Sequence, residues 1–326
     1  MGGATLREVT RKRLLVCYGT SCPELGEEIA TGIGIAAGKL EISRFSNGEI
    51  YVRFLESVRG ADAFVIQTMA EPVNDNIMEM LLMMDALKRA SAKRITAVVP
   101  YYGYSRQDKK SLSREPISAR LVADILSKAG ADRVLSVDLH AGQIQGFFDF
   151  PVDHITALPI LAGFIAHKNL KDIVVVSPDA GRVKVAMRFA DRLHVPMAIL
   201  HKRRPDKNVA EVLHVIGEVE GKIAVIIDDM VDTAGTMVEA ATALKKRGAV
   251  EIYACATHPI LSGSAIERIR QSEIREMIVT NTLPVPSDKK IDKITVLSIA
   301  PLLADTITAV FKDESVSEIV GGDNQL

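Results

Sequence analysis

Residues 223–248 constrain the fold of this chain most strongly, because they join a buried strand to a helix through an acidic turn. Residues 223–227 are an apolar run rich in β-branched side chains, which predicts a strand buried in a parallel sheet. Asp228 and Asp229 follow, and a small polar turn then leads into a helix predicted over residues 237–247. In an open α/β sheet, ligands bind at such carboxyl ends of strands.

The side chains of this turn suit a phosphorylated sugar. Residues from Thr233 to Thr236 are small enough for backbone N–H groups to surround a phosphate, and the helix N-terminus adds a favourable dipole. Asp228 and Asp229 would repel a phosphate, but they suit sugar hydroxyls or a bound metal ion. A Walker loop is excluded, because the turn has no Gly-Lys-Ser/Thr. For a turn of this kind taken alone, an acidic turn with a capping threonine is an open alternative.

Composition sets broad limits on function. With 326 residues, 48% of them hydrophobic, the chain is long enough for two domains with real cores. Its 40 Lys and Arg nearly balance 41 Asp and Glu, so we expect no nucleic-acid or membrane partner. The three cysteines lack metal-ligand spacing, and no apolar run suits a signal peptide or a membrane span, so we expect a cytoplasmic protein with reduced thiols.

Two stretches of the first half could bind a nucleotide. Residues 44–49 form a turn around an Asn-Gly pair, which taken alone usually joins the strands of a hairpin. Residues 101–110 combine three tyrosines with Arg106, Gln107 and two lysines at the end of a predicted strand. Such groups could stack on a base and bind a polyphosphate, although a charged run of this kind is more often a solvated loop.

Candidate metal ligands lie at two predicted strand ends. Asp138 and His140 are two positions apart at the end of the strand predicted over residues 134–138, where alternation would point both to one side. Asp179 follows the strand predicted over residues 173–176. These groups can hold Mg²⁺ directly or through water, whereas a lone histidine is more often a core or loop residue.

A strongly basic segment follows the strand predicted over residues 197–200. Residues 202–207 carry four cations and a proline without an apolar anchor. This composition predicts a mobile charged loop. It could be a solvated turn, or a segment that closes over a polyphosphate and neutralises developing charge.

Strands and helices alternate through both halves, which predicts two doubly wound α/β domains with mostly parallel sheets. We place the domains at residues 1–155 and 156–304, with the C-terminal helix of residues 305–326 as a candidate to pack on the first domain. The helix predicted over residues 74–90 is apolar on more than one side, so a second surface covers it, either of the same chain or, as we favour, of another subunit.

Six stretches, in this order, are similar to the ribose-phosphate pyrophosphokinase (phosphoribosyl pyrophosphate synthetase) family. They are residues 45–49, 104–110, 137–149, 177–179, 202–205 and 228–236. The likeness covers nearly the whole chain, and although each stretch alone is a weak signal, all six in one order are very specific. The resemblance implies a phosphoribosyltransferase-like fold, a homohexamer and Mg²⁺ dependence. It also implies transfer of the pyrophosphoryl group of ATP to ribose 5-phosphate, giving phosphoribosyl pyrophosphate and AMP.

The resemblance further implies roles for individual residues. Ribose 5-phosphate would be held by Asp228, Asp232, Thr233, Ala234, Gly235 and Thr236. ATP would be held by Arg106 and Gln107 and, from a neighbouring subunit, by Asn47, Gly48 and Glu49. Mg²⁺ would be bound by His140 and Asp179. The catalytic residues would be Lys202 and Arg204, of which Arg204 would also contact ribose 5-phosphate.

The chain departs from the family pattern in two places. Asn47 stands where many relatives have Asp, which alters the local charge but keeps a polar side chain. Residues 180–184 read Ala-Gly-Arg-Val-Lys, where many relatives have Gly-Gly and then a basic residue. Residues 111–114 resemble the family's regulatory loop, so activation by phosphate and inhibition by ADP are hypotheses from the resemblance.

Three other functions fit the sequence less well. A phosphoribosyltransferase would share residues 228–236, but it would not need Arg106 and Gln107 or the cations of residues 202–204. A non-catalytic regulatory paralogue would be expected to lose those cations or the metal ligands, and both are present. A ribose-phosphate-sensing repressor would need a helix-turn-helix pattern or a basic surplus, and the sequence shows neither.

Overall fold

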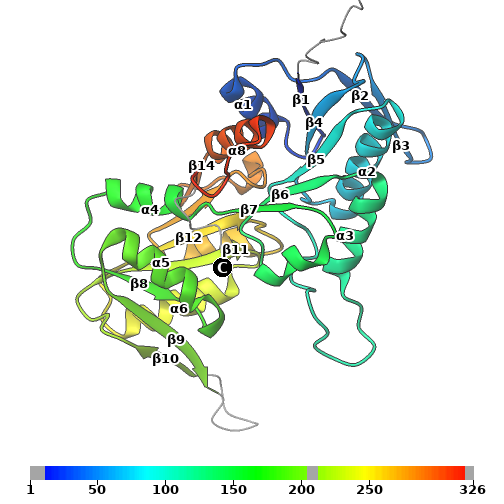
Figure 1. Cartoon of the computed structure of the whole chain (residues 1–326). Coiled ribbons are helices and arrows are strands. Elements are labelled where there is room, and N and C mark those ends of the chain that lie inside the picture. The colour runs from blue at the N-terminus through cyan, green and yellow to red at the C-terminus, as the bar shows by residue number, and fades with distance from the viewer. Residues whose placement is uncertain (1–11, 204–211, 320–326) are drawn as a thin grey trace, which may run out of the picture.

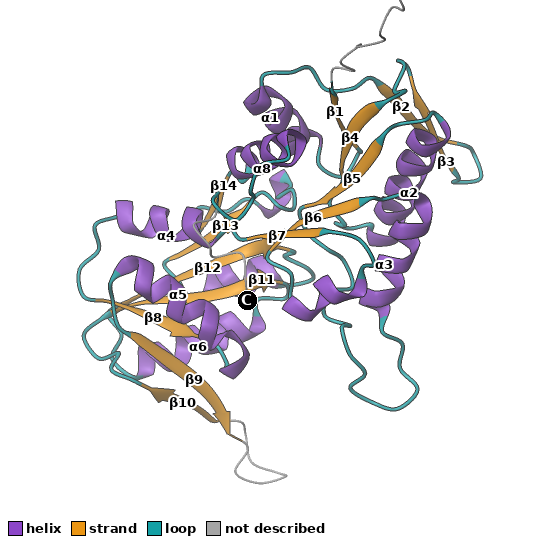
Figure 2. Ribbon diagram, viewed as in Figure 1, coloured by secondary structure: helices purple, strands orange, loops and turns teal. Residues whose placement is uncertain are grey.

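The predicted alternation of strands and helices builds two separate sheets with helices on both faces of each (Figures 1 and 2). The structure is a computed structural model that describes residues 12–203 and 212–319. All strand pairs of the first sheet and all but one pair of the second are parallel. The prediction of two doubly wound, mostly parallel α/β units is confirmed.

The first sheet has five strands in the order β1-β4-β5-β6-β7. In that order they span Arg13–Tyr18, Ala61–Ile66, Arg94–Val99, Arg133–Val137 and Val152–Ile155. Every residue of β4 is buried, as expected where helices cover both faces of a strand. A separate antiparallel hairpin is formed by β2 (Leu40–Arg44) and β3 (Ile50–Phe54).

Four helices enclose this sheet, two on each face. Helices α2 (Val73–Arg89) and α3 (Ser118–Ala129) pack on one face. Helices α1 (Pro23–Ile33) and α8 (Ala300–Lys312) pack on the other, although α8 comes from the far end of the chain. The last helix is therefore part of the first core, and we propose that the boundary between the two units lies at residues 155/156.

The second sheet has seven strands in the order β10-β9-β8-β11-β12-β13-β14. In that order they span Val212–Ile216, Met197–Arg203, Ile173–Ser177, Ile223–Val231, Glu251–Pro259, Glu276–Thr280 and Ile294–Leu297. One face is covered by α4 (Leu158–His167) and α5 (Val183–Leu193), the other by α6 (Gly235–Lys246) and α7 (Ala265–Gln271). None of the helices in the described ranges is long and apolar enough to cross a membrane.

Two boundaries differ from the sequence prediction in ways that matter for the site. Strand β11 does not end at Ile227, because its pairing with β12 continues to Val231, so Asp228 and Asp229 lie within the strand. Strand β6 ends at Val137, so strand alternation does not apply to Asp138 and His140, and the prediction that they share one face for this reason is wrong.

The two sheets meet at their carboxyl ends through buried hydrogen bonds, in a region that we call the seam. His258, at the end of β12, donates from Nε2 to the carbonyl oxygens of Val137 and Asp138, each at 3.1 Å. Thr68, after β4, donates to the carbonyl oxygen of Thr282 at 2.7 Å. Because ligands bind at the carboxyl ends of parallel strands, these contacts bring two such edges to one place.

Candidate functional site

The turn between β11 and α6 has the form of an anion-binding turn. Asp232, Thr233 and Ala234 connect the strand to a helix that begins at Gly235. Ala234 takes a left-handed conformation with φ +61°, which is uncommon for a residue with a Cβ and marks a sharply turned backbone. The first N–H groups of α6 have no partner within the helix, so they are available to an anion.

Asp232 joins this turn to a residue predicted to bind ATP. Its carboxylate lies 2.8 Å from the Arg106 guanidinium, which follows β5 of the other sheet. The Ser262 hydroxyl donates a short hydrogen bond to the second carboxylate oxygen. The structure therefore brings together two groups of predicted residues that are over a hundred positions apart.

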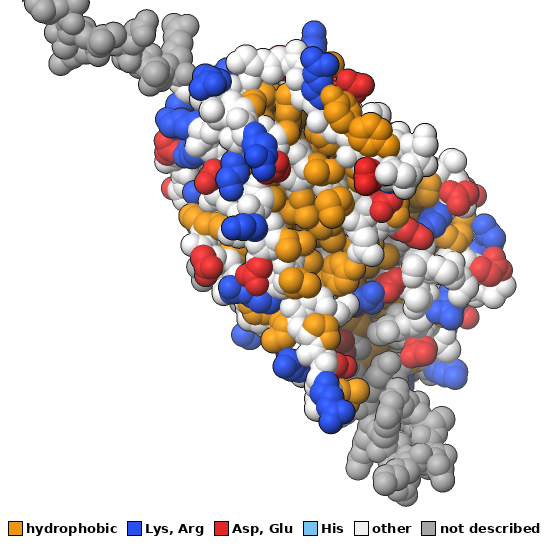
Figure 3. All heavy atoms as spheres, turned by 90° about the vertical axis from the view of Figure 1, so that its right-hand side faces the viewer, with side chains coloured by type: hydrophobic (Ala, Val, Ile, Leu, Met, Phe, Trp, Pro, Cys, Tyr) orange, Lys and Arg blue, Asp and Glu red, His pale blue; other side chains and the backbone are white. Residues whose placement is uncertain are grey.

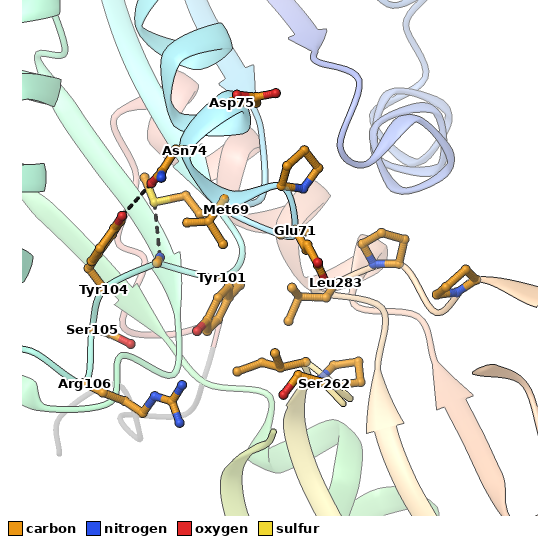
Figure 4. Close-up of a pocket in the computed structure, with 18 of the residues that line it drawn as sticks. Met69, Glu71, Asn74, Asp75, Tyr101, Tyr104, Ser105, Arg106, Ser262 and Leu283 are labelled. Carbon is orange, nitrogen blue, oxygen red and sulfur yellow. Dashed lines mark hydrogen bonds between the residues drawn. The ribbon is translucent and has the colours of Figure 1, made fainter. Parts of the chain in front are cut away.

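Beside this contact lies a cavity of about 890 Å³. Its walls come from both units: Met69 to Asp75, Tyr101 and Gly103 to Gln107 on one side, and loops after β12 and β13 on the other (Figure 4). Arg106 extends from the first wall towards Ser262, and Tyr101 lies above them. Arg106 and Gln107 both line this cavity, which is within the size range of small-molecule sites.

The predicted residues Asn47, Gly48 and Glu49 lie elsewhere. They form the tip of the β2–β3 hairpin, where Gly48 has φ +92° and the Asn47 side chain accepts from the Glu49 N–H at 3.1 Å. All three are exposed, and none lines the cavity. Residues 45–49, which we call the Asn47 turn, therefore form a hairpin tip that does not line the cavity of its own chain.

A second group of predicted residues converges on Arg182, and we call His140, Arg182, Asp228 and Asp229 the carboxylate cluster. The Arg182 guanidinium lies 3.2 Å from Asp228 and 2.6 Å from Asp229. Nδ1 of His140 lies 2.8 Å from Asp229 and 2.8 Å from Arg182. The histidine comes from the first unit and the other three from the second, so the cluster spans the seam.

Burial and charge separate the two acids of the cluster. Burial and the neighbouring charge of Asp229 raise the pKa of Asp228 well above its usual value. Burial acts in the same direction on Asp229, but the hydrogen bond with His140 and the charge of Arg182 outweigh it and lower the pKa of Asp229 to about 2. Asp229 is thus the stronger acid of the two.

His140 belongs to this cluster, and Asp179 lies at the start of the turn that carries Arg182. Asp179 accepts from the N–H groups of Gly181 and Arg182 at 2.8 and 3.1 Å, and so caps a short 3₁₀ helix, η2 (Ala180–Arg182). In the described part of the chain, no three or more His, Cys, Asp or Glu are grouped to hold a metal ion. One imidazole and one carboxylate still fit Mg²⁺, which commonly takes one or two protein ligands and completes its shell with water and substrate phosphates.

The predicted catalytic residues are only partly covered. Lys202 lies in β9, where its backbone pairs with Leu213 of β10. Its side chain and the whole of Arg204 lie outside the described residues.

Arg182 lies in the departure from the family pattern at residues 180–184, and no function was predicted for it. The available signal was a basic residue three positions after the predicted ligand Asp179, at the end of a strand. Only the fold shows that this side chain turns back towards Asp228 and Asp229.

Two doubly wound α/β units that meet around an anion-binding turn and a cavity of small-molecule size are the architecture of a class of transferases that act on phosphorylated ribose. Residues 14–130 match the family described as the N-terminal domain of ribose phosphate pyrophosphokinase. Residues 205–320 match the phosphoribosyl synthetase-associated domain.

Known proteins narrow the class to one family. Ribose-phosphate pyrophosphokinases of Bacillus cereus and Corynebacterium ammoniagenes are each 57% identical to this chain over 294 residues, or 90% of this chain and 93% of the relative. The Bacillus subtilis protein of that name is 54% identical over 306 residues, or 94% and 96%. The crystal structure of phosphoribosylpyrophosphate synthetase from Mycobacterium smegmatis is 52% identical, covers 93% of this chain and 100% of its own, and superposes with a TM-score of 0.88. The chain belongs to the ribose-phosphate pyrophosphokinase family and is an enzyme that forms phosphoribosyl pyrophosphate.

Proposed function

We propose that this chain transfers the pyrophosphoryl group of ATP to the 1-hydroxyl of ribose 5-phosphate at the seam. The observation that carries this proposal is the 2.8 Å ion pair between Asp232 and Arg106. It brings the turn before α6 to the wall of the cavity, so a sugar phosphate on the turn would neighbour a nucleotide in the cavity. Reactions between two bound substrates depend strongly on such positioning.

The start of α6 is the proposed ribose 5-phosphate site. Ribose 5-phosphate would be held there by Asp232, Thr233, Ala234, Gly235 and Thr236. The backbone N–H groups and the helix dipole favour an anion there, and Arg106 and Ser262 already pair with the acidic side chain of Asp232. Asp228, on the strand that leads into the turn, would accept hydrogen bonds from the sugar hydroxyls.

ATP would occupy the cavity beside this site. Arg106 would stack on the base or pair with phosphate, and Gln107 would supply an amide, because both line the cavity. We propose that the Asn47 turn of a neighbouring subunit completes the nucleotide site, since in its own chain the turn is exposed and does not line the cavity.

Mg²⁺ is the proposed metal, held by His140 and Asp179. When bound, it would neutralise and polarise the phosphate groups of ATP. The protein residues would orient the phosphates: the two ligands stand on turns after β6 and β8, at carboxyl ends of the two sheets.

Lys202 and Arg204 would stabilise the charge that develops during transfer, and Arg204 would also contact ribose 5-phosphate. The 1-hydroxyl oxygen would form a bond to the β-phosphorus, the bond from the β-phosphorus to the α–β bridging oxygen would break, and AMP would leave. The hydroxyl proton would pass to solvent. Positioned cations contribute much of the catalysis in such transfers.

A homohexamer is proposed because the face of α2 and α3 carries apolar groups that its own chain leaves open. Met78 and Leu121 are exposed there, and a groove between the helices is lined in part by Leu81, Leu82 and Ile125. Hydrophobic side chains gather on this side of the molecule (Figure 3). An apolar surface of this kind is typical of a protein–protein interface.

Residues 111–114 are the proposed regulatory segment. Residues 111–114 precede α3 and are exposed, and Glu115 accepts from the N–H groups of Ser111 and Leu112, each at 2.8 Å. We propose that this segment responds to phosphate and ADP.

The enzyme would work in the cytoplasm, where ATP and ribose 5-phosphate are available to it.

Phosphorus NMR tests the reaction directly. The purified chain would be mixed with Mg²⁺, ATP and ribose 5-phosphate, with each component omitted in turn. AMP and a new sugar pyrophosphate should appear together only in the complete mixture. ADP with free phosphate would show simple ATP hydrolysis and contradict the proposal, as would no turnover with ATP still bound.

A further inference from the structure

Arg182 occupies a central place that the proposed reaction leaves unexplained. It ends the 3₁₀ helix η2, between β8 and α5, and only 11% of its side chain is exposed. Instead of extending into solvent, the guanidinium contacts both acids of the carboxylate cluster and the His140 ring. A buried arginine with three polar partners has a defined role in this site.

Arg182 balances the negative charge of the two acids. The side chains of Asp228 and Asp229 are only 16% and 6% exposed, and two neighbouring buried carboxylates are unfavourable without a cation. Among the side chains that the structure describes, Arg182 is the only lysine or arginine within ion-pair distance of either acid. Its guanidinium therefore supplies the positive charge that this acid pair needs.

The contacts of Arg182 and Asp229 with His140 compete for one ring nitrogen. Nδ1 of His140 has one hydrogen-bonding position, yet the Asp229 carboxylate and the Arg182 guanidinium both lie 2.8 Å from it. If the ring nitrogen carries a proton, it can donate to Asp229 but faces a donor on Arg182. If it carries none, it can accept from Arg182 but faces an acceptor on Asp229. Whether or not the ring nitrogen carries a proton, one of the two contacts is unfavourable. The hydrogen bonding of the cluster is therefore incomplete while Arg182 occupies it.

A divalent cation could take the place of the Arg182 guanidinium. Carboxylate oxygens and an imidazole nitrogen are ligands for a divalent cation, which satisfies several acceptors at once and has no donor to clash. A cation on these groups and the guanidinium of Arg182 would need the same oxygens. They would therefore exclude each other.

We infer that Arg182 is an internal counter-ion of the Asp228–Asp229 pair, and that it competes with divalent cations for these carboxylates. The inference deepens the proposed function, because it rests on this cluster belonging to the metal- and sugar-binding site. Its consequence is that the substrate-free protein takes up divalent cations weakly at this pair. The cation then enters mainly with a substrate that displaces the guanidinium.

The experiment measures metal binding without turnover. Full-length protein without substrates is titrated with Mn²⁺, and free Mn²⁺ is followed by electron paramagnetic resonance. Arg182→Gln should tighten Mn²⁺ binding at least about tenfold, because a neighbouring positive charge is removed from a weakly screened site. Lys184→Gln, the same loss of charge at an exposed position two residues along, should leave the parent value unchanged, and so should Arg182→Lys.

A double variant locates the effect. Adding Asp228→Asn to Arg182→Gln should abolish the gain in Mn²⁺ affinity, because one of the contested carboxylates is then missing. Unchanged or weaker Mn²⁺ binding in Arg182→Gln would overturn the inference, and so would a gain that persists in the double variant. If Arg182→Gln folds poorly, Mn²⁺ must raise its Tm more than it raises that of the parent, and equal shifts count against the inference.

The outcome is separable from that of the proposed reaction. Phosphoribosyl pyrophosphate formation by the parent, together with equal Mn²⁺ affinities of parent and Arg182→Gln, would overturn the counter-ion role and leave the reaction standing. Tighter Mn²⁺ binding in Arg182→Gln without any turnover by the parent would do the reverse.

Discussion

The carboxylate cluster and the Asn47 turn differ in how much of a site one chain provides. The cluster is mostly shielded from solvent, joins residues from both sheets and has contacts of 2.6 to 3.2 Å between its members. The Asn47 turn is exposed and makes only local hydrogen bonds within the hairpin. The resemblance to one family predicted roles for the Asn47 turn and, within the cluster, for His140 and Asp228.

This difference determines how the cluster and the Asn47 turn can each be tested. A buried cluster is arranged by the fold of a single chain, so substitutions there should act whatever the oligomeric state. An exposed hairpin tip gains a substrate only if another copy brings one to it. Substitutions in the cluster should therefore act within one chain, whereas substitutions in the Asn47 turn should act between chains.

Lys202→Ala tests the own-chain part of the site with the largest effect. We expect kcat to fall by roughly 10³-fold, because a positioned cation that stabilises developing charge is lost. Calorimetric titration with ribose 5-phosphate should still show binding. Lys246→Ala, which removes an exposed lysine at the end of α6, is the control. An unchanged kcat in Lys202→Ala would refute the catalytic assignment.

Asp228→Asn tests the buried cluster. We expect the KM for ribose 5-phosphate to rise about 10- to 100-fold, because a carboxyl oxygen that accepts from the sugar hydroxyls is replaced by an NH₂ group that cannot accept. Asp305→Asn makes the same chemical change at an exposed position of α8 and should leave the KM unaltered. Steady-state kinetics with ribose 5-phosphate as the varied substrate decides the matter, and an unaltered KM in Asp228→Asn would count against its role.

The Asn47 turn calls for a test between chains. The double variant Asn47→Ala/Glu49→Ala should raise the KM for ATP about tenfold or more, because two polar contacts are lost. Dissociating it, mixing it with Lys202→Ala and reassembling should restore activity in up to about one quarter of sites, since some sites then combine an intact turn with an intact lysine.

A second mixture serves as the control for this experiment. Lys202→Ala mixed with Asp228→Asn should restore nothing, because both residues belong to the same chain's part of the site. If the mixture with the turn variant also restores nothing, the turn does not act across subunits, and the comparison between the two regions fails.

His258 gives the smallest effect, on stability. Burial lowers the pKa of His258 despite the charges of Asp138 and Asp229, and His154, whose pKa burial also lowers, lies nearby. The unfolded chain takes up a proton near pH 6.5 and the folded chain does so only at lower pH, so the stabilisation present above pH 6.5 is lost as the pH falls.

Urea unfolding from pH 7 to pH 5 measures this loss. The free energy of unfolding should decrease by about 1 kcal/mol more in the parent than in His258→Asn. Equal slopes in the two proteins would show that His258 takes up its proton equally in both states. Because His258 holds Val137 and Asp138, the test also reports on how firmly the seam supports the cluster.

Elements with a long, regular pattern were predicted well from the sequence. The helix predicted over residues 74–90 and the strand predicted over residues 173–176 agree with α2 and β8 to within one residue at each end, because their apolar patterns are long and regular. Helix α5 was not assigned, although its apolar side chains pack in the second core. The end of β11 was missed because parallel pairing with β12 extends the strand through two acids that its local sequence disfavours.

The site could be predicted as a set of residues but not as a geometry. Family resemblance supplied Arg106 and Asp232 separately, whereas their contact depends on how two sheets meet. The pairing of His140 with Asp229, 89 positions apart, and the inward turn of Arg182 are likewise products of tertiary structure. Spacing along a chain carries no information about such contacts.

The return of α8 to the first sheet has a consequence for the mechanics of the enzyme. The chain passes between the two units twice, once from β7 to α4 and once from β14 to α8. Two covalent connections define an axis, so rotation of one unit on the other is confined to bending about the line between them. They also make the first unit discontinuous in sequence, whereas the second runs unbroken from α4 to β14. A chain cut after residue 155 would expose the apolar surface of Val16, Ile29 and Phe64 that α8 covers.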